Sequence, residues 1–161
     1  MNDLKFAIDM ELDGEKYYRQ QAEMNKNNSL RSVCLMLAED EKMHAKILTD
    51  KMNEKPWEFI DTGTLSRAKN IFEGIGDIKI EEKELVSQFD FYRIATEKEK
   101  KSIDLYTEYK SKAYGDKEKE LFDFLIKQEE QHYAVLDELS TMLRRTQDWV
   151  ENAEFGIRKE Y

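Results

Sequence analysis

The sequence predicts an all-α protein, a four-helix bundle with a long crossover between helices 2 and 3 and a short C-terminal helix. Three observations favour this fold. The 161 residues include a single proline, whereas Lys and Glu, which form helices readily, are abundant. Apolar residues recur at helical spacing along most of the chain. Turn signals interrupt that pattern at only a few places.

The first two helices are expected near the N-terminus. Asn2 or Asp3 can cap a helix that runs to about Asn25. Ser29 can cap a second helix, which has to end before Pro56 because proline interrupts helical hydrogen bonding. Since only a short turn separates these two helices, we expect them to be antiparallel neighbours.

Residues 54–79 form the expected crossover. Within it, Thr64 can cap a short helix that runs through Phe72. We expect this long connection to return the chain so that the third helix starts at the same end of the bundle as the first.

The third and fourth helices are expected in the second half of the chain. The third runs from about Ile80 to Ala113, where the tripeptide Tyr-Gly-Asp at 114–116 interrupts it. The fourth runs from Lys117 to about Met142. Residues 143–161 form a separate C-terminal segment with a short amphipathic helix. All of these elements are expected to belong to one domain that spans residues 1–161.

Charge and composition restrict the partners and the location of the protein. The formal net charge of −9 argues against a nucleic-acid binder, because no basic stripe can neutralise phosphates. No apolar stretch approaches the length of a membrane span, and the N-terminus has no signal-peptide pattern. The one cysteine, Cys34, cannot form an intramolecular disulfide and is expected in the core. We therefore expect a cytoplasmic protein that binds neither nucleic acid nor membrane.

The two halves of the chain, about residues 3–53 and 80–142, repeat each other. A shift of 88 positions aligns them without a gap. The matched pairs are Ala7 and Ala95, Glu11 and Glu99, Tyr18 and Tyr106, Leu37 and Leu125, Glu41 and Glu129, His44 and His132, and Leu48 and Leu136. The chain has only two histidines, and each follows a Glu by three residues. Since several of the matched residues are polar, which a core does not require, we interpret the halves as two copies of one helix pair.

The repeated polar residues predict a metal site. Residues i and i+3 share a helix face, so the Glu and the His of each Glu-x-x-His motif point the same way. One Glu from each of two helices, with a Glu-x-x-His from each of the other two, is the ligand set of dinuclear carboxylate sites in bundles. Four carboxylates offset the charge of two divalent ions, and without metal they would repel one another in the core. The predicted ligands are Glu11, Glu41, His44, Glu99, Glu129 and His132.

These motifs resemble those of the ferritin-like di-iron superfamily, and most closely those of its rubrerythrin and bacterioferritin branch. The resemblance covers most of residues 4–140 and rests on Glu11-x6-Tyr18, Glu41-x2-His44, Glu99-x6-Tyr106 and Glu129-x2-His132. It implies a ferritin-like bundle that holds two iron ions. It also implies terminal ligands at Glu11, Glu99, His44 and His132, metal-bridging ligands at Glu41 and Glu129, and tyrosines beside the ligands at Tyr18 and Tyr106.

Several positions depart from the patterns of these relatives. Rubrerythrins carry a further carboxylate one turn after the third-helix ligand, where this chain has Ser102, whose repeat mate is Gly14. Bacterioferritins place a haem-ligating Met directly after the second-helix Glu; this chain has Lys42 there, so no haem is expected. A rubredoxin domain is not expected either, because Cys34 is the only cysteine. The resemblance implies a stand-alone rubrerythrin-like domain with a symmetric four-Glu, two-His site.

Some residues of the predicted site have a second interpretation. Each Glu-x-x-His pair could instead be a surface ion pair or contain an ordinary core histidine. Tyr18 and Tyr106 are candidate catalytic residues, but buried tyrosines with one hydrogen bond are also common. Gly14 within a helix costs up to about 1 kcal/mol relative to Ala. It either leaves room near the metals for a small substrate or meets a packing need.

The resemblance implies an oxidoreductase that reduces hydrogen peroxide or dioxygen, with electrons from an external donor such as a rubredoxin-like protein. One alternative is a ferroxidase or another iron-handling ferritin-like protein. A manganese catalase and a metal-stabilised bundle without turnover are further alternatives. Manganese or a mixed metal pair would suit the same ligands. A homodimer is expected, because it is the commonest assembly of symmetric proteins.

Overall fold

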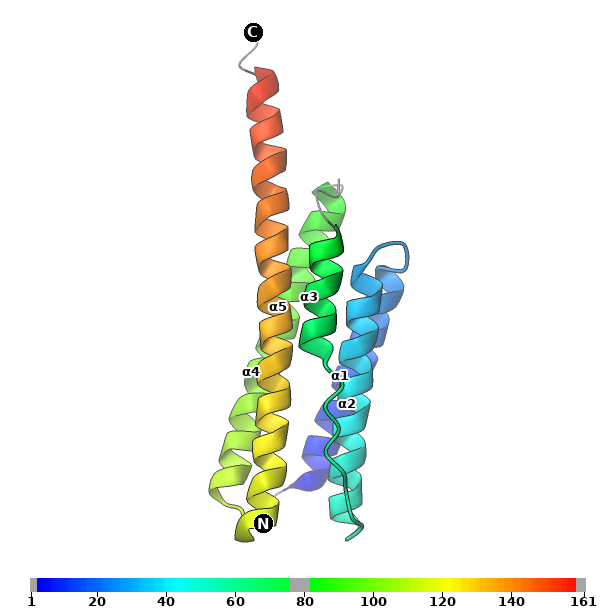
Figure 1. Ribbon diagram of the computed structural model, residues 1–161, viewed down its shortest axis with the longest axis vertical. Helices are drawn as coiled ribbons and strands as arrows, with labels where there is room; N and C mark the ends of the chain where they lie inside the picture. The colour runs from blue at the N-terminus through cyan, green and yellow to red at the C-terminus, as the bar shows by residue number, and fades with distance from the viewer. Residues whose placement is uncertain (1–2, 76–81, 159–161) are drawn as a thin grey trace.

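A computed structural model describes residues 3–75 and 82–158, and this part of the chain contains five α-helices and no strand (Figure 1). The helices are α1 (Leu4–Met24), α2 (Leu30–Met52), α3 (Thr64–Ile75), α4 (Glu82–Ser111) and α5 (Gly115–Arg158). The predicted all-α fold is therefore confirmed. The predicted start of the third helix at Ile80 lies outside the described residues.

The helix starts show which predicted caps form. The side chain of Asp3 accepts a hydrogen bond from the backbone N–H of Phe6 at 3.0 Å, as a helix N-cap does. Ser29 makes no such bond. The side chain of Asn28 instead accepts a hydrogen bond from the backbone N–H of Leu30 at 2.9 Å. The prediction that the Ser29 side chain caps this helix was therefore wrong.

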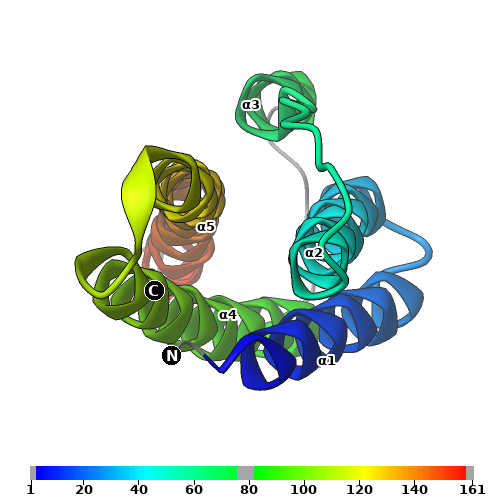
Figure 2. The ribbon, with the colours of Figure 1, turned by 90° about the horizontal axis from the view of Figure 1, so that it is seen from below.

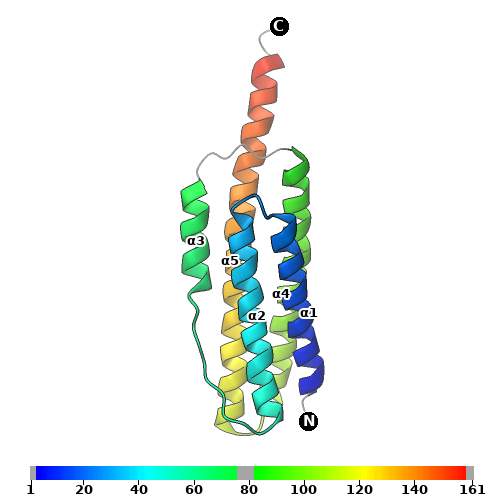
Figure 3. The same cartoon turned by 90° about the vertical axis from the view of Figure 1, so that its right-hand side faces the viewer.

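The four long helices form two antiparallel pairs, α1 with α2 and α4 with α5 (Figures 1 and 2). Seen end-on, α1 lies beside α4, and α3 lies outside the bundle against α2 and α5 (Figure 2). The segment between α2 and α3 runs back along the outside of α2 (Figure 3).

The direction of α4 differs from the prediction. The third long helix starts at the end of the bundle opposite to the start of α1, so α1 and α4 are antiparallel (Figure 3). Since α2 already returns the chain to the starting end, a short loop would have begun α4 there. The crossover takes the chain back along the bundle, which reverses the direction that we expected.

The C-terminal half of α5 also differs from the prediction. We expected a break after Met142, but α5 is one helix of 44 residues (Figure 1). No glycine or proline lies between Met142 and Thr146 to interrupt it. What changes there is burial: Leu143 is fully buried, whereas Trp149 is 52% exposed. The end of a core-facing pattern was therefore mistaken for the end of a helix.

The apolar core has two clusters. One contains Tyr18, Cys34 and Leu136, and the other contains Ala7, Leu48 and Tyr106. Cys34 is 0% exposed, as predicted. Tyr18 and Tyr106 are the members of the two clusters that bond to the buried polar groups described next. The polar groups therefore touch both clusters.

Among the described helices, none combines the length and the apolar character that a membrane crossing needs.

Candidate metal centre

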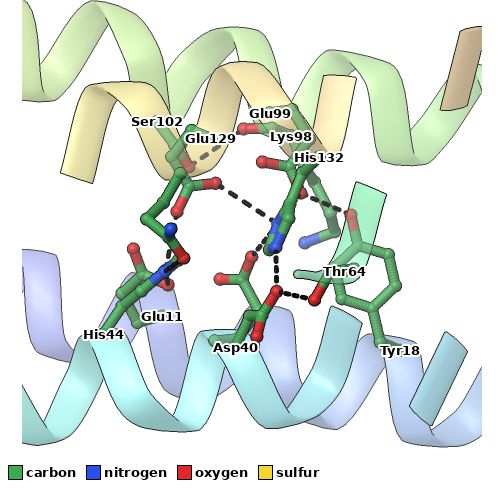
Figure 4. A network of polar contacts seen from close by, with 12 residues as sticks. Glu11, Tyr18, Asp40, His44, Thr64, Lys98, Glu99, Ser102, Glu129 and His132 are labelled. Carbon is green, nitrogen blue, oxygen red and sulfur yellow. Dashed lines mark hydrogen bonds and ion pairs between the residues drawn. The ribbon is translucent and has the colours of Figure 1, made fainter. Parts of the chain in front are cut away.

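The six side chains predicted as metal ligands lie together inside the bundle, and Figure 4 labels all of them except Glu41. Glu11 comes from α1 and Glu99 from α4, and α2 and α5 each supply one Glu-x-x-His motif. Their exposed fractions are 1% for Glu11, 4% for Glu41, 0% for His44, 2% for Glu99, 0% for Glu129 and 1% for His132. Such burial is incompatible with ion pairs on a solvated surface.

Local sequence explains why each motif points inward. In α2, Leu37, Glu41, His44 and Leu48 follow one another at three- and four-residue steps, and the two leucines are 0% exposed. Apolar residues on either side of the motif thus fix the helix face that is buried. The motif lies in the middle of that face, so its side chains are carried into the core.

The ligand atoms form two groups that share two carboxylates. One group is Glu11, Glu41, His44 and Glu129, and the other is Glu41, Glu99, Glu129 and His132. Within each group, one ligand atom from every residue lies within 4.8 Å of the others. Glu41 and Glu129 belong to both groups, which is the placement that bridging ligands between two metal ions require.

The histidines direct the same ring nitrogen toward these carboxylates. His44 Nδ1 lies 2.9 Å from a carboxylate oxygen of Glu129 and 3.3 Å from one of Glu11. His132 Nδ1 lies 3.2 Å from an oxygen of Glu41 and 3.3 Å from one of Glu99. Each Nδ1 therefore faces the carboxylates of its own group, and each Nε2 is left for another partner.

The two tyrosines each hold a carboxylate from the opposite half of the chain. The Tyr18 hydroxyl donates to Glu99, and the Tyr106 hydroxyl donates to Glu11, both at 2.5 Å. Along α1, Glu11 precedes Tyr18, and along α4 their partners follow in reverse order, which requires the two helices to be antiparallel. The tyrosines thus position the carboxylates of α1 and α4.

Two residues that the sequence analysis missed complete the network. His132 Nε2 lies 2.9 Å from the carboxylate of Asp40, and His44 Nε2 lies 3.1 Å from the amide oxygen of Gln128. Asp40 and Gln128 are also repeat mates at a shift of 88 positions, each directly before a Glu-x-x-His motif. That shared position is a signal in the sequence, but Asp and Gln are not identical and so do not stand out as a matched pair.

Gly14 provides space for a predicted ligand. A Cβ atom at this position would lie 2.9 Å from Oε2 of Glu41, closer than real Cβ contacts come. The room that glycine leaves is filled by the Glu41 carboxylate. This contact supports the packing interpretation of Gly14, whereas its place in the lining of the cavity described below supports the interpretation that it leaves room for a small substrate.

Burial and mutual repulsion divide the carboxyl groups into two kinds. Burial raises the pKa of Glu41 and Glu129 well above its usual value, and the neighbouring carboxylates raise it further. Burial also acts to raise the pKa of Glu11, but His44 and the hydrogen bonds around it prevail and lower it to about 2. The pKa of Glu99 is lowered in the same way, because the effect of His132 and of its hydrogen bonds outweighs that of burial. The two shared carboxyls are those that favour a proton in the metal-free protein.

The histidine and tyrosine groups respond to the same charges. Burial lowers the pKa of His132, but Glu99, Asp40 and Glu41 outweigh it and raise the pKa well above 6.5. Burial and the nearby carboxylates raise the pKa of Tyr18 and Tyr106 well above 10, so both hydroxyls keep their protons and donate.

The donor set fits two divalent cations. Three buried carboxylate oxygens, Oε2 of Glu99 and both oxygens of Glu129, accept no hydrogen bond. Oε1 of Glu129 lies 2.9 Å from His44 Nδ1, but this nitrogen has no proton to donate when Nε2 carries the ring N–H. Buried polar atoms are rarely left in this state, because their desolvation is not compensated. Carboxylate oxygens and imidazole nitrogens are ligands for iron, manganese and zinc, so a metal pair would supply the missing partners.

A cavity of about 380 Å³ connects the centre to the surface between α1 and α4. Its lining includes the predicted ligands Glu41 and Glu99 together with the exposed residue Lys101. Gly14 and Ser102, the two small repeat mates, also line it. Both residues are small, which leaves this face of the centre open.

Comparison with known proteins agrees with the geometry. The family model described as Rubrerythrin matches residues 2–140, which contain all six predicted ligands. No match was found among curated proteins or among solved structures.

Proposed function

Because this chain belongs to the rubrerythrin family, we propose that it is a di-iron oxidoreductase that reduces hydrogen peroxide or dioxygen. The observation that carries the proposal is the pair of buried ligand groups that share Glu41 and Glu129. In the proposed centre, Glu11 and His44 are the terminal ligands of one iron, and Glu99 and His132 are those of the other. Two iron ions fit this donor set, and manganese or a mixed pair is the alternative.

Bound iron ions would supply the electrons for the reaction. Reduction of one peroxide molecule takes two electrons and two protons, breaks the O–O bond and yields two water molecules. The electrons have to be replaced by an external donor, for which we propose a rubredoxin-like protein. A homodimer and a cytoplasmic location remain predictions from the sequence.

The protein's own side chains have three tasks in this proposal. The cavity between α1 and α4 admits the small oxidant and leads it to Glu41 and Glu99. Tyr18 lines that cavity and donates to Glu99, so its hydroxyl is both near the oxidant and fixed in direction. Tyr106 has no place in the cavity lining and positions Glu11 only. Because Tyr18 lines the cavity and Tyr106 does not, we propose Tyr18 as the tyrosine that contacts substrate.

A ferroxidase is the second candidate function. The symmetric ligand set, with Ser102 where rubrerythrins carry an additional carboxylate, is the observation that favours it. The long α5, which extends beyond the other helices, does not resemble a subunit of a closed iron-storage cage (Figure 1). A large iron-filled assembly in size-exclusion chromatography would favour the ferroxidase over the peroxidase.

The first test is anaerobic loading of the metal-free protein with Fe(II). We expect about two irons per chain, as in other bundle-type dinuclear sites. Adding stoichiometric peroxide should produce near-ultraviolet ferric absorption. With an electron donor present, peroxide should be consumed over many turnovers. The variants Glu41→Ala and His132→Ala should lose the absorption.

Glu130→Ala is the matched control, because Glu130 is exposed and lies beside Glu129. It should behave like the unmodified protein. Fewer than one tightly bound iron per chain would contradict the proposed centre. Two bound irons that never oxidise would instead favour a metal-stabilised bundle without turnover.

A further inference from the structure

The two halves of the centre differ in one pair of repeat mates that contact the histidines. The ligands and the tyrosines are identical between the halves, but Asp40 in α2 is matched by Gln128 in α5. Both side chains are buried, with exposed fractions of 2% and 4%. One histidine therefore rests on a carboxylate and the other on a neutral amide.

Asp40 is held by three donors, of which Figure 4 labels His132 and Thr64. One carboxylate oxygen accepts from His132 Nε2 at 2.9 Å and from the Thr64 hydroxyl at 2.6 Å. The other accepts from the Thr62 hydroxyl at 2.6 Å. These threonines come from the crossover and the start of α3, so the segment outside the bundle fixes the carboxylate that faces His132.

Gln128 performs the same positioning for His44 without a charge. Its amide oxygen lies 3.1 Å from His44 Nε2, so it accepts from the ring N–H and leaves Nδ1 free to face the carboxylates. An amide fixes the ring in the same tautomer as a carboxylate does. It does not add electron density to the ring to the same degree.

We infer that Asp40 makes the two metal positions unequal, with the position completed by His132 and Glu99 binding its ion more tightly and filling first. A carboxylate that accepts from a ligating imidazole raises the basicity of the other ring nitrogen and orients the ring. Partners of this kind change metal affinity about 10- to 100-fold. This inference rests on the proposed dinuclear centre and concerns how its two positions differ.

Zn(II) titration followed by NMR of ¹⁵N-histidine tests the order of filling. The chain has only two histidines, so every labelled ring signal belongs to His44 or His132, and His44→Gln assigns them. Zn(II) is diamagnetic and redox-inert, so the readout does not depend on activity. Below one equivalent, we expect the signals of His132 to shift to their bound positions before those of His44.

Two substitutions exchange the character of the supports. Asp40→Asn should weaken the tighter step about 10- to 100-fold and make the two histidines fill together. Gln128→Glu should strengthen metal binding at His44 and so reduce the difference in affinity between the two positions. The double variant Thr62→Val, Thr64→Val keeps the charge of Asp40 and should keep the order of filling. Far-UV circular dichroism checks that each variant is folded.

Each outcome separates the inference from the proposed function. Two Zn(II) ions that bind with no preference for His132, or an order that Asp40→Asn leaves unchanged, would overturn the inference while the dinuclear centre stands. A protein in which neither histidine binds Zn(II) would overturn both. Loss of the order in the threonine double variant alone would show that anchoring of the crossover, and not the charge, sets the difference, which also overturns the inference.

Discussion

Gly14 is the residue at which the helix and the centre have opposite requirements. An alanine in a helix is favoured over glycine by up to about 1 kcal/mol. Here the added Cβ would meet the Glu41 carboxylate at 2.9 Å. The glycine therefore gives up helix stability so that a shared carboxylate can occupy its position.

We expect Gly14→Ala to stabilise the metal-free protein or leave it unchanged, and to weaken metal binding. The displaced Glu41 belongs to both ligand groups, so binding of both ions should suffer. Gly74→Ala is the control, because a Cβ there would meet nothing within 4 Å. Calorimetric Zn(II) titrations of the two variants provide the comparison. Equal affinities would contradict the assignment of Gly14 to Glu41.

The tyrosine hydroxyls act on single carboxylates. Tyr106→Phe removes the donor to Glu11 and leaves a buried acceptor unpaired, which typically costs about 1–3 kcal/mol. We expect both a lower free energy of unfolding and weaker Zn(II) binding.

Tyr109→Phe is the control for this substitution. Tyr109 lies on the same helix, but its hydroxyl donates to the backbone carbonyl of Asp3 at 2.8 Å. This variant should lose stability in urea unfolding and keep its zinc affinity. If both variants weaken zinc binding equally, Tyr106 has no particular role at the centre.

At this scale the cluster could be predicted from the sequence, whereas the residues that support it could not. The six residues could be found because a helix fixes which side chains share a face, and the repeat marked the polar ones. Asp40 could not be found in this way, because its partner His132 lies 92 positions along the chain on another helix. Likewise, the competition between Asn28 and Ser29 for a backbone N–H depends on turn geometry that composition does not determine.

At the scale of the element, α5 has two parts with different roles. The part that carries Glu129 and His132 is packed in the bundle, and Leu143 is its last buried residue among those with described side chains. Beyond it the helix continues with exposed residues such as Trp149. Helix-forming residues without a breaker determine the length of the helix, whereas the core determines only where burial ends.

A chain that ends at Thr146 should therefore keep the centre. Among the removed residues with described side chains, 147–152, none is buried. Substitutions at exposed positions usually change stability by less than about 0.5 kcal/mol. We expect unchanged Zn(II) stoichiometry and an unchanged urea midpoint of the zinc-loaded protein. Sedimentation of both forms shows whether the removed part takes part in self-association. Loss of zinc binding would mean that the projecting part supports the centre.

The crossover shows why the direction of a helix is harder to predict than its existence. The short helix α3 could be recognised from local signals, but Thr64 is its first residue and donates to Asp40, so it is not the cap that we predicted. The direction of α4 depends on how far the crossover travels, which no residue pattern near it records. The hydrogen bonds of Tyr18 and Tyr106 to the opposite halves fix that direction once the structure is known.

At the scale of the whole molecule, the charged centre makes stability depend on metal and on pH. In the metal-free protein, the raised pKa of Glu41 and Glu129 gives stability that is present below their usual value of 4.5 and is lost as pH rises through the raised pKa. The lowered pKa of Glu11 has the opposite effect on stability: its contribution is present at higher pH and is lost as pH falls toward about 2. The pKa of His132 is also raised, so its contribution to stability is lost as pH rises above 6.5.

We therefore expect the free energy of unfolding of the metal-free protein to fall between pH 5 and pH 8. Zinc should reverse this trend, because metal binding requires deprotonated ligands. At a zinc concentration about 1,000 times the dissociation constant, the gain should be about 4 kcal/mol. Urea unfolding at both pH values, with EDTA or with zinc, measures both effects. A metal-free protein that is more stable at pH 8 would contradict the expected charge state of the shared carboxyls.

The hydrogen bonds that cross the centre come in reciprocal pairs: Tyr18 reaches Glu99 as Tyr106 reaches Glu11, and His132 meets Asp40 as His44 meets Gln128. Such an arrangement is isologous, the contact pattern of a two-fold homodimer, here between two hairpins of one chain. Because the two hairpins belong to one chain, they need not be identical, as the two subunits of a true homodimer must be. Each half can therefore diverge alone, and every substitution on one side has an unmodified counterpart on the other for comparison.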